Sequence, residues 1–148
     1  MTIFIVHRIN QSSQLADLWS GYGAEVDIRS NGEELIVHHD PFQAGEAFRV
    51  WAAKYRHNTL ILNVKEEGLE PYILEILDEF QLTNWFFLDQ SFPFLVKYAE
   101  LLKGRSAVRL SEFESFDTVQ SLSGLIDWIW IDCFTHMPLS KELVQRLN

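Results

Sequence analysis

The architecture of the chain follows most directly from residues 23–42, which read GAEVDIRSNGEELIVHHDPF. The first half of this segment alternates polar and apolar residues, as a half-buried strand does. Because successive strand side chains point to opposite faces, Glu25 and Asp27 share one face, and Val26 and Ile28 share the other. Two carboxylates on one face repel each other unless a cation or a basic side chain lies between them. The pair is therefore a candidate metal-binding or phosphate-handling site.

The second half of this segment predicts a hairpin that returns toward the first half. Residues 30–32 read SNG, which is a turn signal, and an apolar run follows at residues 35–37. This run leads into His38 and His39 and is stopped by Pro41. The hairpin thus carries imidazoles back toward the carboxylates. Only one of the two histidines is expected to point inward, because adjacent strand residues face opposite ways.

The composition predicts a single domain over residues 1–148. Hydrophobic residues make up 47% of the chain and aromatic residues 14%, which is enough to build a packed core. The formal net charge of -9 argues against nucleic-acid binding, since a phosphate-backbone binder normally carries a basic surface. A single cysteine, Cys133, cannot form an intramolecular disulfide, so we expect no disulfide scaffold.

The first eight residues, MTIFIVHR, contain an apolar run that is only as long as a strand and that no basic region precedes. We therefore expect no signal peptide and no membrane span. The expected location is the cytoplasm.

Short apolar runs alternate with stretches of helical periodicity along the chain. Besides the segment above, we expect strands at residues 3–6, 59–65, 85–88, 107–111 and 126–132. Helices with an apolar stripe are expected at residues 14–22, 44–55, 69–80, 94–103, 118–122 and 139–147. Strict alternation of β and α elements predicts an α/β fold with a parallel sheet covered by helices.

Polar residues gather where the expected strands end. They are His7, Arg8, Asp27, Arg29, Lys65, Asp89, residues 109–111 and Asp132. In parallel α/β folds, ligands bind at the carboxyl ends of the strands. Strand ends are also polar wherever the chain re-enters solvent, so single residues such as Asp89 or Asp132 are equally typical of caps and loops. Glu25 and Asp27 differ, because they lie inside a strand, where an unpaired carboxylate is costly to bury.

In these motifs the chain resembles the glycerophosphodiester phosphodiesterase family, whose members are (β/α)8 barrels related to phosphatidylinositol-specific phospholipase C. The resemblance lies mainly in the first 65 residues, and a looser similarity covers residues 89–92. It rests on four motifs in a fixed order: His7-Arg8, Glu25-x-Asp27, Asn31-Gly32 and Val37-His38-His39-Asp40-Pro41. Each motif alone carries little information, whereas the set is fairly specific.

The resemblance implies hydrolysis of a small phosphodiester, with His7 and His39 as a general acid/base pair. Imidazole suits this role because it titrates near neutral pH, so one ring can accept a proton while the other donates one. Arg8 and Lys65 would share the negative charge of the phosphate. The expected partner is a small phosphodiester substrate rather than a nucleic acid.

The resemblance also implies a divalent cation, Mg2+ or Ca2+, held by Glu25, Asp27 and Asn63. Asn63 stands where the family has a glutamate, so it would ligate through its amide oxygen without adding charge. The family's Pro-Glu-Asn-Thr segment is replaced by residues 10–14, NQSSQ, which removes another carboxylate. These departures favour an alternative function, a non-catalytic or altered-activity relative of the family that binds a phosphorylated ligand.

The length of the chain bears on the completeness of the barrel. A full eight-unit barrel takes about 200–250 residues, and the sequence predicts about six βα units. We therefore expect a TIM-barrel-like α/β fold with a shortened or incomplete barrel. The chain would then be either a fragment truncated at the C-terminus or a subunit of a homo-oligomer that covers the open sheet edges. A flavodoxin-like fold is the architectural alternative, although no glycine-rich phosphate loop follows the first strand.

Overall fold

The computed structural model describes residues 2–146 and is organised around β2 (Gly23–Asn31), the nine-residue strand at the centre of the larger sheet. β2 pairs in parallel with β1 (Ile5–Val6) and, on its other side, with β5 (Leu60–Val64). Beyond the turn at Gly32, whose φ of 66° suits glycine, the chain returns as β3 (Glu34–Val37), antiparallel to β2. The predicted hairpin is thus confirmed.

The remaining strands complete the larger sheet and form a second sheet of two strands. β6 (Trp85–Leu88) pairs in parallel with β5, and β7 (Ala107–Leu110) pairs in parallel with β8 (Trp128–Ile131). A parallel bridge between Phe87 and Ser106 joins β6 to β7. The two-residue strand β4 (Glu46–Ala47) adds to the outer side of β3.

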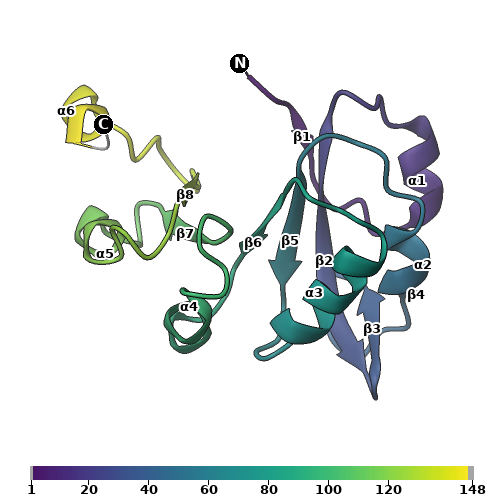
Figure 1. Cartoon of the computed structure of the whole chain (residues 1–148). Helices are drawn as coiled ribbons and strands as arrows, with labels where there is room; N and C mark the ends of the chain where they lie inside the picture. The colour runs from purple at the N-terminus through teal and green to yellow at the C-terminus, as the bar shows by residue number, and fades with distance from the viewer. Residues whose placement is uncertain (1, 147–148) are drawn as a thin grey trace.

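The helices lie against one face of these strands. Figure 1 shows the first three helices on one side of the sheet formed by β2 and β5. The helices are α1 (Ser12–Asp17), α2 (Phe48–Ala52), α3 (Glu70–Glu79), α4 (Phe92–Tyr98), α5 (Phe116–Ser121) and α6 (Lys141–Arg146).

The main core lies between the sheet and the first three helices. Val26 and Ile28 of β2 are fully buried there, as are Trp51 of α2 and Ile73 of α3. Leu95, Val108 and Val119 belong to a second buried cluster, which lies by α4, α5 and β7. The buried strand residues in these clusters point toward the helices. The alternate residues of the same strands therefore point to the opposite face of the sheet.

The fold is a mixed α/β structure in which β and α elements alternate, as the sequence predicts. The larger sheet has six strands and is mixed rather than wholly parallel, because β3 and β4 run antiparallel. No closed barrel is formed by the described residues. No helix within residues 2–146 is long and apolar enough to cross a membrane.

Several predicted helices differ from the observed ones in length. The helix expected at residues 44–55 begins only at Phe48, because residues 46–47 pair with β3 as a strand. α1 ends at Asp17, since Leu18 has an extended backbone. The last helix begins at Lys141, after Ser140, whose hydroxyl accepts a hydrogen bond from the Leu143 amide at 3.1 Å. The predicted end of this helix, Leu147, lies outside the described residues.

Candidate functional site

All seven residues that the sequence predicts for a site line one cavity of about 260 Å3, near the carboxyl ends of the parallel strands. They are His7, Arg8, Glu25, Asp27, His39, Asn63 and Lys65. The cavity is also lined by Leu88, Asp89, Arg109, Trp130 and Asp132. We call these twelve residues the candidate site. Their catalytic and binding roles remain predictions.

The strand register explains why these side chains converge. Asp27 of β2 lies opposite Asn63 of β5, and Glu25 lies two residues before Asp27. Val26 and Ile28 point toward the helices, so Glu25, Asp27 and Asn63 point to the opposite face of the sheet. Of the two adjacent histidines, His39 lines the candidate site and His38 does not, in agreement with the expectation that only one of them points inward.

Glu25 is held by two donors from neighbouring elements. Its Oε2 accepts a hydrogen bond from the Arg8 backbone N–H at 2.7 Å, and its Oε1 accepts one from Asn63 Nδ2 at 2.7 Å. Arg8 has a left-handed backbone with φ of 56°, a strained conformation for a residue with a side chain. Because the carboxylate is only 2% exposed, these bonds replace water around its charge.

Asp27 is completely buried and is held by an amide and an ammonium. Its Oδ2 accepts a hydrogen bond from Asn10 Nδ2 at 2.7 Å, and its backbone N–H donates to Asn10 Oδ1 at 3.0 Å. Lys65 Nζ lies 3.1 Å from Asp27 Oδ1. Sequence reasoning missed Asn10, because nothing in a loop sequence fixes which strand residue it will meet.

The predicted cation ligands are already paired with groups of the protein. Both oxygens of Glu25 and both oxygens of Asp27 face donors of this chain. Asn63 Oδ1 and Asp27 Oδ1 are both buried without a hydrogen-bond partner among the described residues, although Lys65 Nζ lies 3.1 Å from Asp27 Oδ1. Among the described residues, no group of three or more His, Cys, Asp or Glu side chains is arranged to hold a metal ion. In this arrangement the donor set does not fit a divalent cation, and the cation remains a prediction to be tested by titration.

The two histidines lie on different sides of Arg8 in the candidate site. The His7 ring packs on Trp130 with 5.3 Å between ring centroids, and its Nδ1 lies 3.9 Å from Glu25 Oε2. His39 Nε2 lies 3.2 Å from Arg8 Nη2, and its Nδ1 lies 2.8 Å from Asp40 Oδ1. The hydrogen bond to His39 lowers the pKa of Asp40. Asp40 is thus a carboxylate that orients the His39 ring.

A chain of alternating charges crosses the candidate site from β2 to β8. Lys65 lies between Asp27 and Asp89, at 3.7 Å from Asp89 Oδ2, and Arg109 is hydrogen-bonded to both Asp89 and Asp132. Burial disfavours the charged form of Arg109, but the hydrogen bond that it donates to Asp89 and the negative charges of Asp89, Asp132 and Glu114 raise the pKa of the guanidinium. The sequence marks Asp89, Arg109 and Asp132 as polar strand ends without assigning them a role.

The charges that line the candidate site nearly cancel. The cations are Arg8, Lys65 and Arg109, and the carboxylates are Glu25, Asp27, Asp89 and Asp132. With neutral imidazoles the site therefore carries one more negative than positive charge. Arg8 is the cation whose side chain has no carboxylate within salt-bridge distance among the described residues, so it is the one best able to receive an anion.

In comparisons with known proteins, no family model, no curated protein and no solved structure matches the chain.

Proposed function

We propose that this chain binds a small phosphodiester in the candidate site and hydrolyses it with His7 and His39 as a general acid/base pair. The fold we propose for it is an incomplete (β/α) barrel, in which β1, β2, β5, β6, β7 and β8 are successive parallel strands of one curved sheet. Their parallel pairing in chain order supports this assignment.

The observation that carries the proposal is that two solvent-accessible imidazoles and a guanidinium without a carboxylate partner line one cavity. The side chains of His7 and His39 are 55% and 40% exposed, so both rings can exchange protons with solvent and reach a ligand. A phosphate oxygen would accept hydrogen bonds from Arg8 in a bidentate arrangement. This would draw Arg8 away from His39 and free Nε2 for proton transfer.

Each imidazole then has a distinct task. One ring accepts a proton from the attacking water as the new P–O bond forms, and the other donates a proton to the leaving alkoxide as its bond to phosphorus breaks. Asp40 keeps the His39 ring oriented with Nε2 toward the ligand, because it occupies Nδ1. Lys65 lies at the same cavity and adds positive charge near the phosphate, although Asp27 and Asp89 offset part of it.

A second function is favoured by the pairing of the carboxylates. Glu25 and Asp27 are held by hydrogen bonds from Asn63 and Asn10 and by an ion pair with Lys65, which is what a binding protein without metal-assisted catalysis would retain. In that case the candidate site would bind a phosphorylated ligand and release it unchanged.

Hydrolysis of bis(glyceryl) phosphate, whose leaving group is an alkoxide, measured together with its binding by calorimetry, separates the two functions. The proposal predicts turnover by the wild type and a loss of about 100-fold or more in both His7→Ala and His39→Ala, with binding retained. His136→Ala is the matched control, because His136 is exposed and lies outside the candidate site. Binding without turnover would select the second function, and absence of both would reject both functions. Repeating the assay after chelation tests the dependence on a divalent cation.

A further inference from the structure

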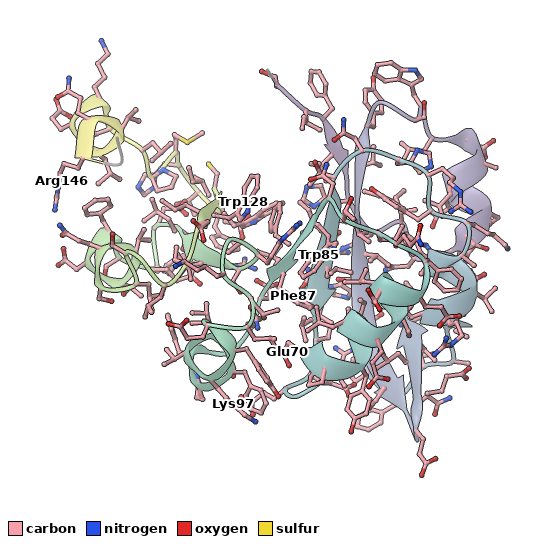
Figure 2. The ribbon with its side chains drawn as sticks, in the orientation of Figure 1. Glu70, Trp85, Phe87, Lys97, Trp128 and Arg146 are labelled. Carbon is pink, nitrogen blue, oxygen red and sulfur yellow. The ribbon has the colours of Figure 1, made fainter. Side chains whose placement is uncertain are left out.

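Asp89 lines three cavities, one of which is the candidate site. It directly follows β6, the strand that carries Trp85 and Phe87 in Figure 2. The other two are a cavity of about 700 Å3, lined by the segments after β6 and β7, and a cavity of about 180 Å3, lined by the segments after β5 and β6. The Asp89 backbone is left-handed, with φ of 62°, which costs free energy in a residue with a side chain. Strain at such a position indicates a role in the site.

The negative charge of Asp89 is surplus to the ion pairs around it. Lys65 Nζ lies 3.1 Å from Asp27 Oδ1 and 3.7 Å from Asp89 Oδ2, so another carboxylate is closer to this ammonium. Arg109 is hydrogen-bonded to Asp132 as well as to Asp89. Each of the two cations is therefore balanced by a second carboxylate, and Asp89 adds a charge that no cation of its own cancels.

A ligand in the candidate site meets this surplus charge before it meets that of Glu25. Glu25 has no Lys or Arg side chain within salt-bridge distance among the described residues, but its carboxylate is held by two N–H donors and the residue is 2% exposed. The side chain of Asp89 is 23% exposed. Asp89 is therefore the accessible carboxylate whose charge acts on an anion bound at Arg8.

The chemistry of hydrolysis makes such a charge selective. A phosphodiester carries one negative charge, whereas a phosphomonoester carries close to two above its second pKa of about 6. When water attacks the diester and the P–O bond to the alcohol breaks, the products are the monoester dianion, the alcohol and a proton. Since Coulomb energy is proportional to charge, a fixed carboxylate repels the monoester about twice as strongly as the diester.

We propose that Asp89 is a specificity-determining residue, whose charge disfavours a dianionic phosphomonoester relative to a monoanionic phosphodiester and so promotes release of the product. Arg8 attracts both ligands, and Asp89 discriminates between them. This inference rests on the proposed function, because the phosphate must bind in the candidate site for Asp89 to act on it.

Binding of methyl phosphate and dimethyl phosphate, titrated by phosphorus NMR at about pH 8, tests the role of Asp89. At this pH the first ester is a dianion and the second a monoanion. Asp89→Asn removes the charge and keeps the size of the side chain. We expect it to raise the affinity for dimethyl phosphate about 3-fold and that for methyl phosphate about 10-fold, because the second effect is the square of the first.

Glu100→Gln is the matched control, because it removes one carboxylate from an exposed position outside the candidate site. We expect both affinities to change by less than about 1.5-fold in this variant, since salt screens distant surface charges. Asp89→Gly removes the same charge and suits the left-handed backbone, so it gives a second reading in case the asparagine variant folds poorly.

The gain in affinity for the monoester is decisive, because losing a merely structural carboxylate would weaken binding or leave it unchanged. Unchanged or weaker binding of methyl phosphate in both Asp89 variants, or equal gains for the two esters, would overturn the inference and leave phosphate binding by the wild type intact. If the wild type bound neither ester, the proposed function would fail. Binding of methyl phosphate that appeared only in the Asp89 variants would then still support the role of Asp89, and its absence there would reject it.

Discussion

Replacing Asn63 by glutamate places a third carboxylate beside Glu25 and Asp27, and it tests how the candidate site is held together. In the wild type, Asn63 Nδ2 donates a hydrogen bond to Glu25 Oε1 at 2.7 Å. Both side chains are buried, at 7% and 2% exposure. In Asn63→Glu this donor becomes an acceptor, and two carboxylates face each other in the interior.

The expected effect is large for a single substitution. A hydrogen bond to a charged group contributes about 1.5–3 kcal/mol, and removing one partner of a buried pair costs about 3–5 kcal/mol. We therefore expect Asn63→Glu to lower the free energy of unfolding by about 3–5 kcal/mol at neutral pH without metal. Since small domains have about 5–15 kcal/mol in total, the variant should remain folded but be much less stable.

Magnesium should reverse part of this loss in the variant. Glu25, Asp27 and Glu at position 63 would together present three carboxylates, which is a plausible oxygen-ligand set for a divalent cation. A ligand at about 100 times its dissociation constant stabilises the folded state by about 2.7 kcal/mol. In the wild type we expect a much smaller response, because the two carboxylates already have donors from the protein.

Urea unfolding with and without magnesium measures both effects. Asn84→Glu is the control, because the Asn84 amide bonds to Asn58 at an exposed position, and its change should stay within about 0.5 kcal/mol. If Asn63→Glu were as stable as the wild type without metal, the contact between Asn63 and Glu25 would not be holding the site. If magnesium stabilised both proteins equally, the three carboxylates would not converge.

Two other predictions concern single side chains. Burial raises the pKa of Tyr55, whose hydroxyl donates to the Asn58 carbonyl oxygen at 3.2 Å. Because the raised pKa favours the neutral phenol in the folded state, its contribution is present below about pH 10 and is lost as the pH rises further. Chemical unfolding of wild type and Tyr55→Phe above that pH should show a steeper decline in the wild type; parallel curves would contradict this. Arg109→Met leaves Asp89 and Asp132 without their shared cation and should lower the free energy of unfolding by about 1–3 kcal/mol, whereas Arg146→Met, on the exposed last helix, should have little effect. Equal stability of these two variants, measured by urea unfolding, would show that the guanidinium bridge contributes nothing.

Much of the fold could be predicted because local patterns and global structure agree. Strands such as residues 60–64 and 85–88 are short apolar runs buried on both faces, and the helices between them carry an apolar stripe. The strand at residues 46–47 could not be predicted, because it forms only by pairing with β3. Its Glu46 also accepts hydrogen bonds from Ser12, a contact that depends on tertiary structure.

The candidate site was predictable to the extent that strand geometry fixes it. Period-two alternation places Glu25 and Asp27 on one face, and parallel pairing brings Asn63 beside them. The partners of these residues were not predictable. Asn10 reaches Asp27 from a loop, and the Arg8 amide reaches Glu25 through a left-handed backbone that a sequence pattern does not reveal.

The sparse backbone pairing between β6 and β7 predicts that the strands on its two sides open as separate units. β1, β2, β5 and β6 are joined by parallel ladders, whereas among the described residues one bridge, together with the hydrogen bond from the Phe87 amide to the Arg105 carbonyl, connects β6 to β7. Backbone amides of β7 and β8 should therefore exchange with deuterium through partial opening, at a lower free energy than those of β2 and β5. Arg109 and Trp130 belong to the second unit, and His7 and Glu25 belong to the first. A ligand in the candidate site would touch both units, so slower amide exchange in β7 and β8 would report its binding before any substrate is known.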